Sequence, residues 1–379
     1  EIRFCDWSSD VCSSDLSEEV RLAGESERWS WLVGAFYANE NLDSRNQLIY
    51  GTQLQPYFGR LLGNPGAITL FTGNPNAYQG GLGTRDVYEQ DSKTWALFTN
   101  NNIRFTDALE LTLGLRYTDE SKNLDSQYFN EHNGIGCQAL RNNRVAITNT
   151  INALVNNPDP AIAAALRQQA LQTVYGLGCA TFADPIYNDV LSSQSLDEAE
   201  WSGTVKLALR FTDEVMSYLS FARGYKAGGF NLDRERSGNQ ALNPGIPGGI
   251  AIDTDTKFDK ELVDSYELGL KTQWLDDSLL LNAAVFYQDY TDFQLNTFTG
   301  TQFIVTSLPK VNSQGVDLDI VWYTPLEQLS LQGGVTYADT QIEDFGSAEA
   351  NFRPERKDDT LSFAPEWSAS LSATFEHRF

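Results

Sequence analysis

Leu109-Glu110-Leu111-Thr112-Leu113-Gly114-Leu115-Arg116-Tyr117 is the stretch that decides the fold. Every second residue from Leu109 to Tyr117 is apolar, and the residues between them are polar or very small. Because successive side chains of a strand point to opposite faces, this pattern predicts a β-strand with one apolar and one polar face. Strands of soluble sheets usually run about five or six residues, whereas a tilted strand needs about nine to eleven to cross a bilayer. The stretch therefore favours a membrane-spanning strand.

Similar alternation recurs along the chain, and its repetition points to a barrel. The further stretches are 29–37 (a fainter case), 201–211, 266–274, 279–287, 316–322, 329–337 and 367–375. With the weaker candidates 86–105, 215–230 and a short segment near 301–307, we count about twelve strands. The pattern predicts an all-β fold, an antiparallel transmembrane β-barrel.

Aromatic residues often end the apolar faces, and Tyr and Trp gather at the two membrane interfaces of such barrels. The alternative is ordinary aromatic packing inside a large β-sandwich. The residues concerned are Tyr117, Trp201, Phe211, Tyr266, Trp274, Trp322, Tyr337 and Trp367.

The connections alternate between short and long. Short turns are expected at 106–108, 212–214, 276–278 and 325–327, and long connections at 41–85, 124–195, 231–258, 297–304 and 341–360. Outer-membrane barrels have short periplasmic turns on one rim and long extracellular loops on the other. A soluble sandwich has no reason to sort its loops by side, so this alternation supports the barrel.

The composition excludes some classes of function. A net charge of −24 and a pI near 4.4 argue against nucleic acid as a partner. The mean hydropathy of −0.35 is compatible with a barrel, which keeps its charges in loops and lumen. The sequence has no apolar run of about 18 residues, so it predicts no transmembrane helix. No secretory signal is visible at the start, and since an exported barrel needs one, we expect the N-terminus to have been lost.

The longest loop, 124–195, contains Cys137 and Cys179, each preceded by a Gly-x-Gly sequence. An exported loop passes through an oxidising compartment, so a Cys137–Cys179 disulfide is expected. The alternative is two free, partly buried thiols.

A helix is also expected in this loop. Asp159 can cap it, Pro160 suits its first position, and residues 161–175 are rich in Ala, Leu and Gln before Gly176. Such a helix could fold over the mouth of the barrel, but a simple surface insertion is the favoured interpretation.

Residues 1–16 lack the alternation and resemble translated sequencing-adapter read-through. We interpret them as a non-native leader and draw nothing from Cys5 and Cys12. The domain expected is then a partial barrel over residues 17–379.

Catalytic and metal-binding residues are not expected. The chain has two histidines, His132 and His377, which cannot assemble a Ser/His/Asp or zinc set. No Gly-rich phosphate-binding motif precedes a helix. Asp253 and Asp255 suggest calcium only weakly and fit solvated loop charge better. We therefore expect neither an enzyme nor a cofactor.

Five segments together resemble TonB-dependent outer-membrane receptors. The most telling is the strand-to-loop motif Tyr-Leu-Ser-Phe-Ala-Arg-Gly-Tyr-Lys-Ala-Gly-Gly-Phe-Asn at 218–231. Glu-Leu-Val-Asp-Ser-Tyr-Glu-Leu-Gly-Leu-Lys at 261–271 follows at the family's usual distance, and 281–294, 312–317 and 364–368 complete the match. The resemblance covers roughly residues 18–379.

The resemblance implies a barrel of about 22 strands closed by an N-terminal plug. Such receptors are monomers in the outer membrane of Gram-negative bacteria and import a ferric siderophore or similar bulky nutrient, powered by the TonB complex. Here no plug or TonB box precedes the first strand, and too little follows Trp367. Phe379 imitates a barrel C-terminus, but we expect a fragment that lacks both ends.

The polar faces of the strands carry the candidate site residues. In the family this wall packs on the plug and frames the ligand path, so ion pairs with the plug are favoured over direct ligand contact. The residues predicted to point into the lumen are Arg116, Lys206, Arg210, Glu267, Lys271, Asp317 and Asp319.

The motif that runs out to the loop should shape the outer rim, since its glycines let the backbone bend. A ligand role for Tyr225, Lys226 or Phe230 stays open. The rim residues are Gly224, Tyr225, Lys226, Gly228, Gly229, Phe230 and Asn231. Loop aromatics that could stack on an aromatic siderophore are Tyr57, Phe58, Phe71 and Tyr78.

The leading hypothesis is thus the barrel part of a nutrient transporter. The alternatives are a passive porin-like channel, which would have no plug, and a surface structural or adhesion barrel whose long loops bind other molecules.

Overall fold

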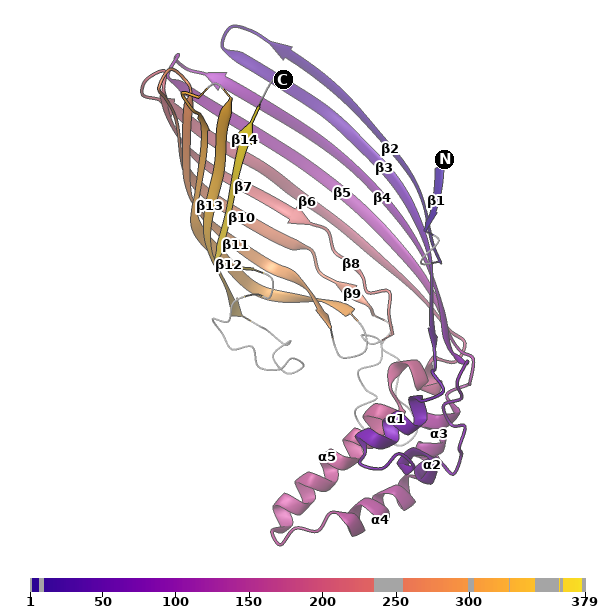
Figure 1. Cartoon of the computed structure of the whole chain (residues 1–379). Helices are drawn as coiled ribbons and strands as arrows, with labels where there is room; N and C mark the ends of the chain where they lie inside the picture. Colours follow the sequence, from indigo (N-terminus) through magenta and orange to yellow (C-terminus); the bar gives the residue numbers. More distant parts are fainter. Residues whose placement is uncertain are drawn as a thin grey trace.

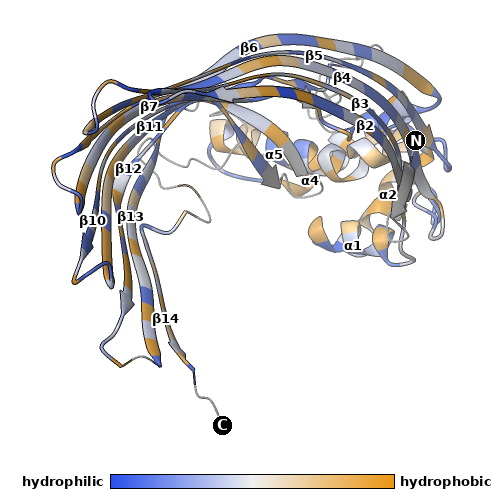
Figure 2. Cartoon of the chain, turned by 90° about the horizontal axis from the view of Figure 1, so that it is seen from above, coloured by the Kyte–Doolittle hydropathy of each residue, from blue (hydrophilic) through white to orange (hydrophobic). Residues whose placement is uncertain are grey.

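One antiparallel sheet makes up most of the computed structural model, which describes residues 2–6, 10–234, 255–298, 303–326, 328–344, 361 and 364–376. Within these residues the sheet has 12 strands, and it forms an open, curved wall (Figures 1 and 2). The predicted all-β antiparallel architecture is confirmed. In order across the sheet the strands are β1 (Ile2–Asp6), β2 (Asp10–Glu25), β3 (Trp29–Ile49), β4 (Gly83–Arg104), β5 (Leu109–Asn130), β6 (Val190–Arg210), β7 (Val215–Lys226), β10 (Glu261–Trp274), β11 (Leu279–Phe298), β12 (Phe303–Tyr323), β13 (Leu329–Asp344) and β14 (Trp367–Phe375).

Several strands are longer than the alternation predicts. β4 and β5 have 22 residues each, about 70 Å at ~3.3 Å per residue. The predicted loops 41–85 and 124–195 are therefore too long, because the strands leave only 50–82 and 131–189 between them. Beyond the bilayer the outer face of a strand meets water, so the apolar alternation ends before the backbone pairing does.

Two predicted strands are parts of one. Residues 303–307 of the predicted segment near 301–307 and the stretch 316–322 both belong to β12, which has an irregularity against β13 at Lys310/Val311. A bulge of this kind bends a strand without ending it. The predicted strand 215–230 instead ends at Lys226, and β8 (Gly229–Phe230) pairs with β9 (Lys257–Phe258) apart from the main sheet.

Some predictions fall on residues outside the described ranges. They include most of the loops 231–258 and 341–360, the middle of 297–304, and the positions of Asp253, His377 and Phe379. His132, in contrast, is described and buried.

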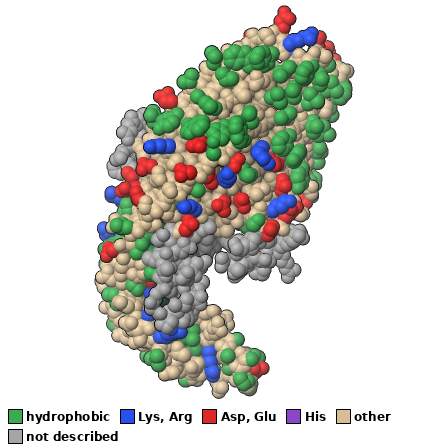
Figure 3. All heavy atoms as spheres, turned by 180° about the vertical axis from the view of Figure 1, so that it is seen from behind, with side chains coloured by type: hydrophobic (Ala, Val, Ile, Leu, Met, Phe, Trp, Pro, Cys, Tyr) green, Lys and Arg blue, Asp and Glu red, His purple; other side chains and the backbone are tan. Residues whose placement is uncertain are grey.

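An apolar band covers the outer face of the sheet near the end with the short turns (Figure 3). Two rows of aromatic side chains border it, eight or ten residues apart where a strand reaches a ring in both rows. At ~3.3 Å per residue and a tilt of about 40°, the shorter spacing is roughly 20 Å. Rings within the upper row touch: the centroids of Tyr117 and Trp201 are 4.9 Å apart, as are those of Tyr337 and Trp367. The upper row is Tyr37, Trp95, Tyr117, Trp201, Phe221, Tyr266, Tyr287, Tyr337 and Trp367, and the lower row is Trp29, Phe105, Phe211, Trp274, Trp322 and Phe375.

Helices from two separate connections pack together at the other end of the strands, on the concave side of the wall (Figure 2). We call this unit the helical cap. It consists of α1 (Leu54–Leu61), α2 (Ala67–Thr72), α3 (Ile135–Asn142), α4 (Arg144–Leu154), α5 (Pro160–Gly178) and the short helices η1 (Thr181–Ala183) and η2 (Pro185–Tyr187). No helix in the described residues is long and apolar enough to cross a membrane.

The predicted loop helix is α5. The Asp159 carboxylate accepts hydrogen bonds from the backbone N–H groups of Ala161 and Ile162, and Pro160 takes the first helical position. The helix runs on to Gly178, past the predicted end at Gly176. Four further helices, α1 to α4, lie in connections where the sequence predicts only loop.

Candidate functional site

The inner face of the sheet, opposite to the apolar band, carries the seven charged residues predicted to line the lumen. Strand register links them: Lys206 lies opposite Ser220, and Ser220 lies opposite Glu267. Counted across the pairs in this way, all seven lie on one face. Among the described residues, no ion pair joins any two of them.

Arg116 on β5 lies among aromatic rings. Its guanidinium carbon is 5.3 Å from the centroid of the Phe36 ring and 5.6 Å from that of Phe98, and its Nε donates to Thr118 Oγ1 over 3.0 Å. Cations are attracted to ring faces at such distances. Arg116 is thus held in place by rings and a hydroxyl, and among the residues that the structure describes it forms no ion pair.

A second group on the inner face surrounds Tyr218 of β7. The Tyr218 hydroxyl donates to Glu267 Oε1 over 2.6 Å, and Lys271 Nζ lies 5.9 Å from the centroid of the same ring. On β12 and β13, the Thr336 hydroxyl donates to Asp317 Oδ1 over 2.7 Å. Two of the carboxylates on the inner face thus accept hydrogen bonds from neutral hydroxyl groups. The side chains of Asp319, Lys271 and Arg210 are exposed.

The rim motif turns inward after β7. Gly228 N–H donates to Glu198 Oε2 over 2.8 Å, and its carbonyl accepts from Lys122 Nζ over 2.7 Å. A Cβ at Gly228 would lie 2.6 Å from the Phe258 carbonyl oxygen, so only glycine permits this approach. Phe230 is buried against Tyr88 and other aromatic residues, which makes it part of the rim's core.

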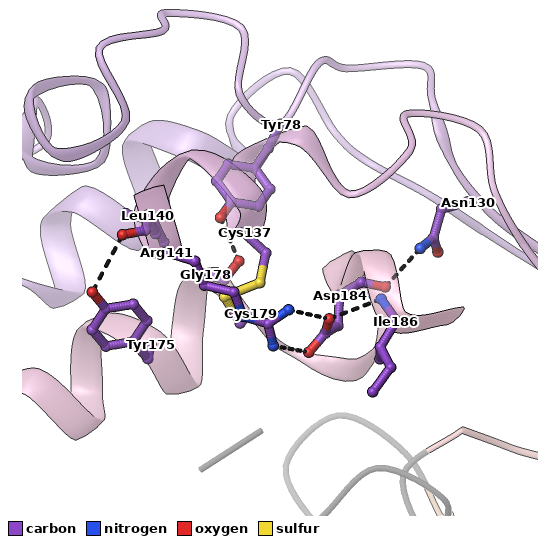
Figure 4. Close-up of a disulfide and its surroundings, with 10 residues drawn as sticks. All are labelled: Tyr78, Asn130, Cys137, Leu140, Arg141, Tyr175, Gly178, Cys179, Asp184 and Ile186. Atoms are coloured by element: carbon purple, nitrogen blue, oxygen red, sulfur yellow. Dashed lines mark hydrogen bonds and ion pairs between the residues drawn. A yellow bond between two sulfur atoms is a disulfide. The ribbon is translucent and has the colours of Figure 1, made fainter. Parts of the chain in front are cut away.

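The helical cap is tied together by the disulfide Cys137–Cys179, the pairing expected from the sequence (Figure 4). Beside it, Asp184 is buried and accepts hydrogen bonds from two nitrogens of Arg141, over 2.9 and 2.7 Å. Tyr78 donates to the Gly178 carbonyl, which joins the two connections that form the cap. Burial raises the pKa of the Tyr78 hydroxyl.

Most loop aromatics named as stacking candidates face the interior of the cap. Phe58 and Tyr78 are 6% and 4% exposed and belong to one apolar cluster. Phe71 packs against the neighbouring cluster. Only Tyr57 among the four is exposed. The sequence alone does not show which of these aromatic side chains are buried, because it does not predict α1 and α2.

A family model and solved structures place this geometry among known proteins. The family model of the TonB-dependent receptor-like β-barrel matches residues 13–379. The chain belongs to the TonB-dependent receptor family. It spans about 40% of the length of the solved receptor barrels that it matches.

Solved structures of uptake receptors and a transporter show the same fold at low identity. The ferric yersiniabactin uptake receptor FyuA from Yersinia pestis has a TM-score of 0.56 at 15% identity, over 96% of this chain and 40% of FyuA. The siderophore receptor PiuA from Acinetobacter baumannii gives 0.55 at 13%, over 96% and 44%. The copper transporter OprC gives 0.55 at 11%, over 97% and 42%. At these identities the likeness concerns the fold alone.

Arg234 is the most buried charged residue in the part of the chain that the structure describes, and it is absent from the predicted site residues. It is 1% exposed, and its guanidinium holds the Asp86 carboxylate. The same group donates to Asn130 Oδ1 over 2.6 Å and to the Phe129 carbonyl over 3.1 Å. Arg234 follows the rim motif in a stretch with no periodicity, so no local pattern marks it.

Proposed function

We propose that this chain forms the barrel wall of an outer-membrane receptor that imports a ferric siderophore or a similar bulky nutrient. Ligand enters from the rim that carries the helical cap and passes along the charged inner face. The inward step draws energy from the TonB complex, through a plug that fills the barrel. The receptor works as a monomer in the outer membrane of a Gram-negative bacterium, and it is not an enzyme.

The contrast between the two faces of the sheet carries this proposal. Outside, apolar side chains lie between two rows of aromatic residues, and the band of roughly 20 Å is close to the ~25 Å apolar belt of outer-membrane barrels. Inside, cations and carboxylates such as Arg116, Lys206 and Glu267 lie on the opposite face without ion pairs among themselves in the described chain. Once a plug covers this face, charges of this kind need a partner in the lumen. Membership of the TonB-dependent receptor family supports the proposed coupling to TonB.

Uptake assays test the proposal. A deletion strain and a complemented strain are compared for accumulation of labelled ferric siderophores under iron limitation, with and without a functional TonB complex. We expect uptake that needs both this gene and TonB. Uptake without TonB would favour a passive channel, and no uptake of any tested nutrient would favour a structural or adhesion barrel.

We also propose that residues 1–16 do not belong to the native protein, so that the barrel domain starts near residue 17. The family match begins at residue 13. Peptide mass spectrometry of the protein from its own cells tests this directly: peptides that cover residues 1–12 would contradict the proposal.

A further inference from the structure

Residues Ala227–Arg234, which we call the strap, leave the end of β7 and lie on the inner side of the sheet at the rim with the long loops. In Figure 1, β8 and β9, which carry part of the strap and its partner segment, lie apart from the main wall at this end. The strap contacts strands that are far from β7 in the order of the sheet. Its course therefore differs from that of a loop that runs along the rim.

At its beginning the strap is held by neighbouring strands. Gln294 Nε2 of β11 donates to the Ala227 carbonyl over 2.9 Å. Gly228 is bound from the other side by Glu198 of β6 and Lys122 of β5. Both sides of the wall thus contact the strap within two residues of its start.

The end of the strap bridges an even wider separation. Asn231 exchanges two hydrogen bonds with Val305 of β12, over 3.1 and 2.7 Å, and Arg234 binds Asp86 of β4. β4 and β12 are six strand spacings apart in the sheet order, about 29 Å at ~4.8 Å per spacing. The three residues from Asn231 to Arg234 span at most about 11 Å of backbone, and the side chains of Asn231 and Arg234 supply the rest of the reach. The strap therefore runs as a chord across the curved wall and links its two sides.

Arg234 fixes the far end of this chord. Its guanidinium carbon lies 5.6 and 5.1 Å from the ring centroids of Tyr128 and Tyr187, and Tyr187 in turn donates to the Arg234 carbonyl. Asp86 is 5% exposed. A fully buried, bidentate ion pair is a strong attachment because removal of either partner leaves an uncompensated charge.

We propose that the strap is a bar across one side of the mouth of the barrel, latched by the Arg234–Asp86 pair, and that it limits the size of what enters on that side. The inference rests on the proposed import function for its purpose. The position of the strap over the inner face does not depend on that function, because it follows from the strap's own contacts. Release of the latch should free the strap and widen the mouth.

The test uses the complete protein that carries this chain, in outer-membrane vesicles without nutrient or energy source. The latch variant is Arg234→Ala with Asp86→Asn, which removes both charges of the buried pair. The matched control is Arg223→Ala with Asp264→Asn, because Arg223 and Asp264 form a similar bidentate pair on the outer face of β7 and β10. Hydrogen exchange is read at the Asn231 and Val305 amides, and a Ser202→Cys substitution on the inner face reports access to maleimides of two sizes.

In the latch variant we expect faster exchange at both amides and about tenfold faster labelling of Ser202→Cys by a bulky maleimide, which corresponds to about 1.4 kcal/mol. The small maleimide and the control pair should show no change. Unchanged exchange would overturn the latch, and unchanged bulky labelling would overturn the bar, as would a Ser202→Cys that neither reagent reaches. If the latch variant opens the mouth but uptake is absent in the wild type, the import function fails and the strap stands.

Discussion

At Asp184 a buried carboxylate joins two parts of the helical cap, since it binds Arg141 and also accepts the backbone N–H of Ile186 over 3.0 Å. Asp184→Ala should lower the local unfolding free energy of the cap by about 3 kcal/mol, because Arg141 loses its partner. Asp159→Ala removes only the exposed cap of α5 and should cost about 1 kcal/mol. Hydrogen exchange across α3 and α5 measures both. Equal losses would mean that burial of Asp184 adds nothing.

Tyr50 should make the stability of the helical cap decrease at alkaline pH. Its hydroxyl donates to the Phe182 carbonyl over 2.6 Å, and burial raises its pKa to about 12. An unfolded tyrosine ionises near pH 10, so between about pH 10 and 12 only the unfolded cap loses this proton, and the free energy of unfolding falls by up to about 3 kcal/mol. Below pH 10 no such loss is expected.

Tyr50→Phe checks this dependence. The variant has no hydroxyl to ionise, so its cap should lose less stability between pH 10 and 12 than the wild type, as followed by circular dichroism of the helices. Tyr78 retains its own raised pKa and leaves part of the slope. Identical pH profiles for the two proteins would show that Tyr50 does not contribute.

At the scale of the elements, a disulfide joins α3 to the end of α5, and we expect it to stabilise the packing of these two helices. Cys137–Cys179 closes a segment with a sequence separation of 42, for which the chain-entropy estimate is about 4 kcal/mol. Cys137→Ser with Cys179→Ser should therefore make 131–189 sensitive to proteolysis while the strands resist. The wild type under reductant should behave in the same way. Equal resistance with and without the bond would mean that packing alone holds the cap.

At the scale of the whole molecule, the edges of the sheet decide how this chain behaves by itself. Within the described residues, β1 pairs only with β2 and β14 only with β13. Unpaired edges act as templates for aggregation and cannot lie in lipid. Residues 17–379 alone, refolded into detergent, should give no heat-modifiable band on an SDS gel. A compact, SDS-resistant band would contradict this expectation, and the complete protein is the positive control.

The sequence by itself determined the features that depend on short-range patterns or on residue type. Alternation from Leu109 to Tyr117 fixes a strand and its lipid-facing side, because side-chain direction has a period of two. Asp159 and Pro160 locate the start of α5, because capping and the φ of proline act within one turn of helix. Cys137 and Cys179 could be paired because they are the only cysteines in an exported loop.

Only the tertiary structure decided what depends on distant partners. The extension of β4 to Gly83 comes from backbone pairing with β3 and β5, which leaves no alternation in the side chains beyond the bilayer. The burial of Phe58 and Tyr78 needs the packing of two separate connections into one cap. Arg234 became recognisable only once the strap brought it to Asp86, 148 residues away, since an ion pair across such a separation leaves no periodic trace in the sequence.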